Sequence, residues 1–138
     1  MRLFLKIEHG HPMREVPALT AVTGRGLEGD VAFGRASRQV LLVAQPTLEA
    51  LGLQPGQIRE NITLDGGLIS NTPAGTRIRI GEAILEVTGD CAPCDQIEAI
   101  RPGLREAIRG WRGILARVEK GGPICVGDSA EVLPADGV

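Results

Sequence analysis

Two cysteines, Cys91 and Cys94, lie three positions apart in the segment Thr88-Gly-Asp-Cys-Ala-Pro-Cys-Asp95. The segment follows an expected strand at 83–88 and precedes an expected helix that begins near Asp95. Backbone N–H groups and the helix dipole stabilise negative charge at such a position, so it favours a thiolate. The thiolate is the form of cysteine that acts as a nucleophile and binds metals. The sequence therefore predicts that this loop carries chemistry.

The Cys91–Cys94 spacing is compatible with four interpretations. A redox pair of the thioredoxin type needs a strand–helix–strand setting, which the surrounding sequence lacks. Half of a zinc site would need His9 and His11 as the remaining ligands. The other two are a single working thiolate and two small, half-buried side chains in a turn. Cys94 is the better candidate for a catalytic or metal-ligating sulfur, because Pro93 fixes the backbone before it and helix amides follow.

Polar residues at 59–61 form a second group of candidates. Arg59, Glu60 and Asn61 lie in an expected strand at 58–64. They either face solvent or anchor an anionic ligand, because arginine binds phosphate and carboxylate groups through two parallel hydrogen bonds. Three more arginines would add to such a patch: Arg25, Arg35 and Arg38.

The composition narrows the classes of function. With 138 residues, the chain is expected to form one domain over 1–138, with its core at 3–133 and a tail at 134–138. A net charge of −2 and 2% aromatic residues argue against nucleic-acid binding. No apolar run approaches the roughly 18–20 residues of a membrane helix, and the alternating N-terminus does not resemble a signal peptide. We therefore expect a cytoplasmic protein without a membrane partner, whose cysteines are free, catalytic or metal-bound.

Hydrophobic periodicity and turn residues predict a mainly β fold. Strands are expected at 3–7, 18–23, 39–44, 58–64, 76–80, 83–88, 114–118, 124–126 and 129–133. A short helix is expected at 45–52, and two short helices or one bent helix follow 95, because Pro102 interrupts the helical pattern. Gly81-Glu82 predicts a two-residue hairpin turn. Many short strands and glycine turns favour a closed or nearly closed β-barrel with a few short helices.

Two further expectations concern packing. Ile58, Ile62 and Leu64 should share one face of the strand at 58–64. Cys125 falls inside a strand and should pack in the core as a small hydrophobic residue.

Six motifs occur in a fixed order along the chain: Gly26-Leu-Glu-Gly-Asp30, Arg38-Gln-Val40, Pro55-Gly56 with Arg59-Glu-Asn-Ile-Thr63, Gly75-x-x-Ile-x-Ile-Gly81, Pro93-Cys94 and Gly121-Gly-x-Ile-x-Val-Gly-Asp128. Together they resemble the MOSC domain, named for the C-terminal domain of molybdenum-cofactor sulfurase. The similarity extends over nearly the whole chain, about 3–133. It implies a MOSC-like β-barrel.

The resemblance also implies a role for Cys94, as a sulfur carrier or as a molybdenum ligand in the pterin cofactor. The residues that it places near the cofactor (molybdopterin) are Arg38, Arg59, Glu60, Asn61, Gly29 and Asp30. No pyridoxal-phosphate domain is present in this chain, so sulfur would come from a partner such as a cysteine desulfurase, or would pass to a molybdenum enzyme. Cys91 could resolve a persulfide at Cys94 as a disulfide.

Three functions stay open at this point. The first is binding of molybdenum cofactor or transfer of sulfur toward it, through Cys94. The second is a molybdenum-dependent reductase component that acts on N-hydroxylated compounds with electrons from partner proteins. The chain departs from such reductases, because it lacks their N-terminal barrel and any electron-carrier motif. The third is a non-enzymatic module that binds zinc or a small anion.

Overall fold

The computed structural model describes residues 1–65, 72–91, 95–110 and 113–134. The large sheet has eight strands, in the spatial order β11 (Ala130–Val132), β7 (Arg77–Ile80), β8 (Ala83–Asp90), β9 (Ile114–Lys120), β5 (Val40–Ala44), β6 (Ile62–Leu64), β1 (Arg2–Leu5) and β2 (Arg14–Val16). The small sheet has the order β10 (Gly122–Cys125), β3 (Ala18–Val22) and β4 (Gly26–Leu27). The helices are α1 (Gln45–Ala50), α2 (Asp95–Ile100) and α3 (Leu104–Ala107).

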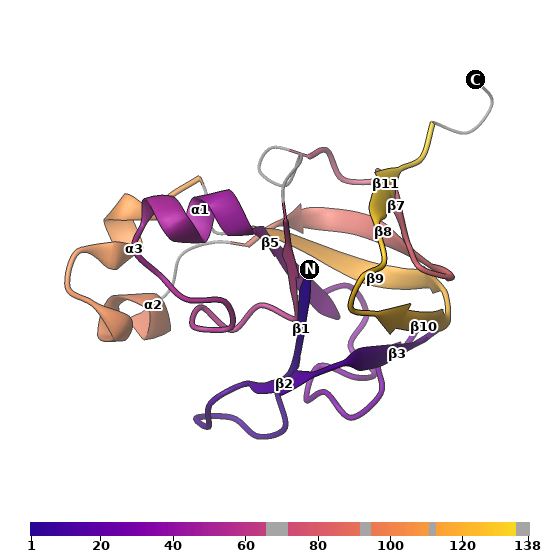
Figure 1. The fold of residues 1–138 in the computed structure, drawn as a ribbon, viewed down its shortest axis with the longest axis horizontal. Helices are drawn as coiled ribbons and strands as arrows, with labels where there is room; N and C mark the ends of the chain where they lie inside the picture. Colours follow the sequence, from indigo (N-terminus) through magenta and orange to yellow (C-terminus); the bar gives the residue numbers. More distant parts are fainter. Residues whose placement is uncertain (66–71, 92–94, 111–112, 135–138) are drawn as a thin grey trace.

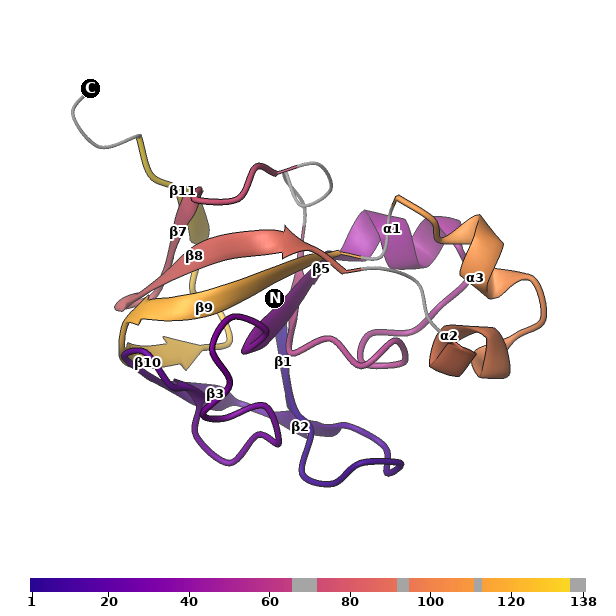
Figure 2. The same ribbon diagram turned by 180° about the vertical axis from the view of Figure 1, so that it is seen from behind.

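The large sheet curls into a half-barrel, and the small sheet packs against it around one aliphatic core (Figure 1). All its strand pairs are antiparallel except β5 and β6, which run parallel and are connected through α1. Figures 1 and 2 show the three helices gathered at one end of the curled sheet. The mainly β, barrel-like fold that the sequence predicts is confirmed.

Strand β5 lies between two cores, which explains why all five of its residues are buried. Val40, Leu42 and Ala44 belong to the core between the sheets. Leu41 and Val43 point the other way, into a cluster made with the three helices. A strand that is covered on both faces has no polar side, so its sequence is a continuous apolar run.

Two local predictions are confirmed. Gly81 adopts a φ of +59° in the two-residue turn that joins β7 to β8, with Ile80 paired to Ala83. Around Pro102 the chain forms two short helices, α2 and α3, rather than one. Residues 135–138 of the expected tail at 134–138, and Cys94, lie outside the described residues.

The strand at 58–64 is shorter than predicted, because β6 begins only at Ile62. Arg59 adopts a left-handed backbone with a φ of +68°, which ends any extended segment at that point. As a result Ile58 packs in the helical cluster, whereas Ile62 and Leu64 pack between the sheets. The prediction that these three residues share one face is wrong.

Cys125 is exposed, so the prediction that it packs in the core is also wrong. It lies at the end of β10, whose burial alternates, and Ile124 takes the inward position instead. Strand β2 was not predicted, because a three-residue strand with two exposed charged residues has no hydrophobic periodicity. Within the described part of the chain, the helices are too short or too polar to cross a membrane.

Candidate functional site

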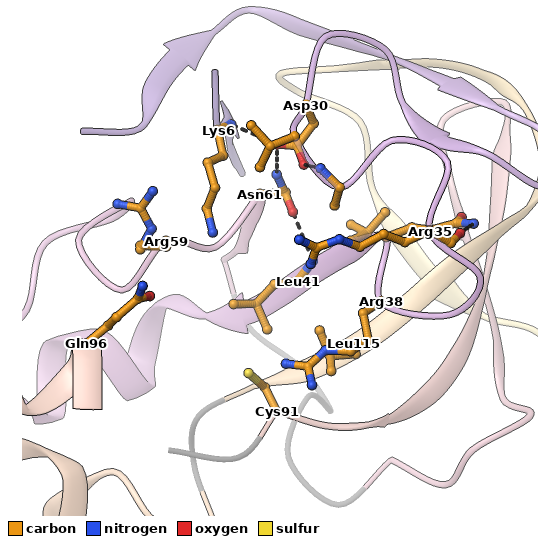
Figure 3. Close-up of a pocket in the computed structure, with 14 residues that line it drawn as sticks. Lys6, Asp30, Arg35, Arg38, Leu41, Arg59, Asn61, Cys91, Gln96 and Leu115 are labelled. Atoms are coloured by element: carbon orange, nitrogen blue, oxygen red, sulfur yellow. Dashed lines mark hydrogen bonds between the residues drawn. The ribbon is translucent and has the colours of Figure 1, made fainter. Parts of the chain in front are cut away.

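A hollow of about 160 Å³ lies beside the large sheet, among loops that adjoin several of its strands. Its lining residues are Lys6, Asp30, Val31, Ala32, Arg35, Arg38, Gln39, Val40, Leu41, Arg59, Asn61, Cys91, Gln96 and Leu115. Figure 3 shows lining residues from β5, β9 and α2, from the loop before β5, and from the segments that follow β1, precede β6 and follow β8. The hollow thus brings together side chains that lie up to 109 positions apart in the sequence (Lys6 to Leu115).

A buried polar pair, Asp30 and Asn61, forms one wall of the hollow. Asn61 Nδ2 donates to Asp30 Oδ1 at 3.0 Å and to the Phe4 carbonyl at 3.2 Å, and its Oδ1 accepts from the Leu41 N–H at 3.0 Å. The Asp30 carboxylate also accepts from the backbone N–H groups of Lys6, at 2.7 Å, and Ala32, at 3.0 Å. These bonds connect β1, β5 and the loop after β4, so the pair acts as an internal brace.

The loop that carries Arg35 and Arg38 is held by the buried amide of Gln39. Gln39 Nε2 donates to the carbonyls of Arg35, at 2.6 Å, and Gly24, at 3.1 Å, while its Oε1 accepts from the Val118 N–H at 2.8 Å. The Thr88 hydroxyl donates to the carbonyl of Ser37 at 2.8 Å. Because several bonds fix its backbone, this loop can present its side chains from a defined position.

Positive charge is concentrated on the hollow. Among the described lining residues, four basic side chains, Lys6, Arg35, Arg38 and Arg59, accompany a single carboxylate, Asp30, although the whole chain has a net charge of −2. Within the described residues, no hydrogen bond or ion pair uses the guanidinium of Arg35 or Arg38, and both side chains are exposed. Figure 3 shows Arg59 on one side of the hollow and Arg35 and Arg38 on the other. Such an arrangement suits an anionic group with several oxygens.

Cys91 contributes a sulfur atom to the same hollow. Its backbone N–H donates to the Gly113 carbonyl at 3.0 Å, just beyond the β8–β9 ladder, which fixes its position. The residue is 9% exposed and sits at the boundary between the helical cluster and the hollow. In Figure 3 the Arg38 side chain extends toward this sulfur.

The structure places the predicted binding residues in two groups. Arg38, Arg59, Asn61 and Asp30 line the hollow. Gly29 and Glu60 do not: Gly29 lies over Leu5, and the Glu60 side chain is fully buried. Glu60 Oε2 accepts from the Gly56 N–H at 2.8 Å and from the Thr63 hydroxyl at 2.7 Å, and so stabilises the turn before β6. The chemistry predicted for Cys94 stays a prediction, because that residue lies outside the described part.

The proposed zinc ligands are not supported by a cluster. Over residues 1–65, 72–91, 95–110 and 113–134, no group of three or more His, Cys, Asp or Glu side chains could hold a metal ion. His9 and His11 are exposed, and His11 Nε2 lies 3.1 Å from a Glu8 carboxylate oxygen.

Among the polar residues of the hollow that lie outside the six motifs, sequence reasoning missed Lys6 and Gln96, and it left the role of Cys91 unassigned. Lys6 follows β1, where a charged side chain is an ordinary way to end a strand. Gln96 is an exposed residue in the first turn of α2. Neither position carries a signal in spacing or composition. On this side of the hollow only Cys91 carries a signal in the sequence, because it lies three positions before Cys94.

The fold and the hollow together define a mainly β, barrel-like domain with a basic pocket that includes a cysteine. A family model described as the MOSC domain matches residues 28–131, and the chain belongs to the MOSC domain family. This family is generally linked to molybdenum-cofactor-related functions. A comparison with curated proteins finds no match.

Solved structures share the fold. The YuaD protein of Bacillus subtilis is 22% identical, with a TM-score of 0.79, over 95% of this chain and 92% of that one. YiiM of Escherichia coli is 23% identical, with a TM-score of 0.68, over 98% of this chain and 71% of that one. YiiM of Geobacillus stearothermophilus is 20% identical, with a TM-score of 0.74, over 96% and 73%. At these identities the likeness establishes the fold alone.

Proposed function

We propose that this protein binds molybdenum cofactor, or carries sulfur toward it, with the anionic end of the pterin in the basic hollow and Cys94 as the sulfur carrier or molybdenum ligand. The observation that supports this proposal most directly is the composition of the hollow. Four cations converge there, and Cys91 and Gln96, which flank Cys94 in the sequence, both line it. An anionic ligand in the hollow would therefore lie next to the loop that carries Cys94.

The residues fit the phosphate end of a pterin cofactor better than its rings. A volume of about 160 Å³ is smaller than the roughly 300–1,000 Å³ of pockets that enclose whole small molecules. Arg35, Arg38 and Arg59 would bind phosphate oxygens, and Lys6 would add charge. When bound, the cofactor supplies a molybdenum centre, for which a cysteine thiolate is a suitable soft ligand.

In the sulfur-carrier case the chemistry needs no added oxidant. The Cys94 thiolate attacks the outer sulfur of a donor persulfide, a new S–S bond forms at Cys94, and the donor leaves as a thiolate. The donor would be a persulfide carried by a protein such as a cysteine desulfurase. The basic side chains of the hollow would compensate the negative charge of the persulfide.

Purified protein provides the test. We expect molybdenum with a fluorescent pterin, or, after incubation with a persulfide donor, a mass gain of one sulfur atom. Either signal should be lost in Cys94→Ser and kept in Cys125→Ser, because Cys125 is exposed and does not line the hollow. Neither signal in the wild-type protein, or equal signals in Cys94→Ser, would contradict the proposal.

Two other results would favour a different function for this protein. Zinc at one ion per chain, lost equally in Cys91→Ser and Cys94→Ser, would favour the metal-binding module. Reduction of a hydroxylamine-type compound by the molybdenum-loaded protein with an artificial electron donor would favour the reductase component.

A further inference from the structure

Strand β11 lies at an edge of the large sheet, and within the described residues it pairs with β7 alone. Figures 1 and 2 show it at the border of that sheet, beside β7. The outer side of an edge strand presents backbone N–H and C=O groups to which another strand can add. Whether β11 suits such an addition depends on the direction of its backbone groups and on its side chains.

The backbone N–H and C=O of Val132 point away from the sheet. The Leu133 N–H donates to the Arg77 carbonyl at 2.8 Å. In an antiparallel ladder, residues that bond to the neighbouring strand alternate with residues that do not. Val132 is paired with Ile78 and precedes Leu133, so its N–H and C=O are directed to the outer side, as are those of Ala130. Two residues of β11 thus offer hydrogen bonds to a further strand.

The side chain of Val132 extends the apolar core to the same edge. Paired residues on neighbouring strands share a face of the sheet, and here they form a row: Val118, Leu85, Ile78 and Val132. Val118 and Leu85 are 0% exposed and Ile78 is 2% exposed, whereas Val132 is 47% exposed. One more strand beside β11 would bury this valine and so complete the row.

Strand β11 is complementary to a second copy of itself in one register. Two copies pair antiparallel about a two-fold axis, and the residue on the axis faces its own counterpart. An axis at Glu131 would place two carboxylates opposite each other, which is destabilising. An axis at Ala130 would place Val132 opposite Asp128. An axis at Val132 joins the two exposed valines and places Glu131 opposite Leu133, so charge and burial favour the same arrangement.

We propose that two copies of this protein associate through antiparallel pairing of their β11 strands, with the two-fold axis at Val132. The N–H and C=O of Val132 exchange hydrogen bonds with the same residue of the second copy, and the Ala130 N–H donates to the Pro134 carbonyl of that copy. A cavity of about 420 Å³, lined by residues 74–77 and 132–134, lies beside this strand. None of the residues that line the basic hollow lies in either segment, so the proposal does not depend on the ligand.

The contact is small, so the dimer should be weak. Strand β11 has three residues, whereas a stable interface buries at least about 1,000 Å² in total. We therefore expect a dissociation constant on the order of 100 µM.

Sedimentation equilibrium of the full chain, from about 10 µM to about 1 mM, measures the association. We expect the average mass of the wild-type protein to rise from that of the monomer toward twice that value. Val132→Lys should weaken dimerisation at least about tenfold, because the two lysines would face each other on the axis. The matched control is Val126→Lys, which changes a valine that is 55% exposed outside β11 and should dimerise like wild type.

Val132→Pro tests the backbone hydrogen bonds. Because the Val132 N–H is directed outward, proline at this position removes the donor to a second copy and leaves the bonds to β7 in place. Dimerisation should fall at least about tenfold, as for Val132→Lys, because the paired bonds on the axis are lost. Melting curves at about 10 µM, where the protein is monomeric, show whether each variant folds, and Val132→Lys carries the test if Val132→Pro does not.

Cysteine cross-linking tests the position of the axis. Cys125 is exposed and is replaced by serine in the parent protein. With a mild oxidant, Val132→Cys should form a disulfide-linked dimer at least about tenfold faster than Glu131→Cys, because residue 132 faces itself. The inference is overturned by a wild-type protein that stays monomeric at about 1 mM, by dimerisation that Val132→Lys leaves unchanged or that Val126→Lys weakens equally, or by cross-linking of Glu131→Cys at an equal or higher rate.

Discussion

Replacing Asn61 with alanine should strongly destabilise the fold. The Asn61 side chain makes three hydrogen bonds inside the protein, to the Leu41 N–H, the Phe4 carbonyl and the Asp30 carboxylate. It is 5% exposed, and Asp30 is 6% exposed, so water has little access to the partners that the substitution leaves behind. Asn61→Ala therefore removes three side-chain hydrogen bonds that join β1, β5 and the loop after β4.

The size of the effect follows from these contacts. Two of the lost hydrogen bonds are between neutral groups, at about 0.5–1.5 kcal/mol each, and the third is to a carboxylate, at about 1.5–3 kcal/mol. Asp30 keeps its bonds from Lys6 and Ala32, so the lower part of this range applies to the third bond. We expect a loss of about 3–4 kcal/mol in the free energy of unfolding. That is a large part of the roughly 5–15 kcal/mol of a typical domain.

Urea denaturation of wild type and Asn61→Ala measures this difference, with an unchanged slope as a check that both unfold in the same way. The matched control is Gln57→Ala, which removes one exposed hydrogen bond to the Gln54 N–H and should cost less than about 1 kcal/mol. A loss below about 1 kcal/mol for Asn61→Ala would refute the reasoning, because it would mean that the brace does not hold these segments together.

Two further predictions concern stability. Gly56→Ala should lower the free energy of unfolding by at least about 2 kcal/mol, because its φ is +84° and an added Cβ would lie 2.8 Å from the Phe4 ring. Gly75→Ala should lower it less, because Gly75 has a similar φ of +92° but no atom within 4 Å of the added Cβ. Equal losses for the two variants in urea denaturation would contradict this prediction. Backbone N–H groups, first that of Gly103, lower the pKa of Glu98, so its contribution is present above the ordinary pKa and is lost as pH falls through the lowered one. Glu98→Gln should therefore lower the melting temperature at neutral pH, and the difference should shrink as the pH falls below the ordinary carboxyl pKa; a pH-independent difference would contradict it.

Those parts of the fold that depend on local patterns could be predicted from the sequence. Alternating or continuous apolar residues located most of the strands, though not β2 and β4, and Gly81-Glu82 located the hairpin, because a two-residue turn with glycine has few alternatives. The apolar run within the expected strand at 39–44 located β5, but the sequence could not show that this strand separates two cores. That division depends on which distant segments cover each face, and no pattern within the strand contains this information.

The errors arose where one residue departs from its usual conformation or environment. Arg59 was expected in a strand because the residues around it are typical of strands, yet its positive φ moves the beginning of the strand to Ile62. Cys125 was expected in the core because cysteine is commonly buried, yet Ile124 occupies the inward position beside it. Residue preferences describe averages, and the packing around each site decides the outcome.

For the hollow, family resemblance identified Arg38, Arg59, Asn61 and Asp30, which do lie together. It could not separate residues that face the hollow from those that support it, and so it included Glu60, which is turned away and bonded to Gly56 and Thr63. A motif shows that neighbouring residues matter, but their separate tasks depend on side-chain directions.

The residues of the hollow fall into two groups: buried residues that hold its shape and basic residues that carry its charge. Substitutions in the two groups should therefore have different effects. Asp30, Asn61 and Gln39 are buried and their hydrogen bonds are made to other protein groups, so their loss should act mainly on stability. Arg35 and Arg38 are exposed and make no described bond through their guanidinium groups, so their loss should leave stability nearly unchanged and act on ligand binding. The described residues thus hold several basic side chains close together on a hydrogen-bonded scaffold, although like charges repel. Such an arrangement is most simply understood as a binding site for an anion.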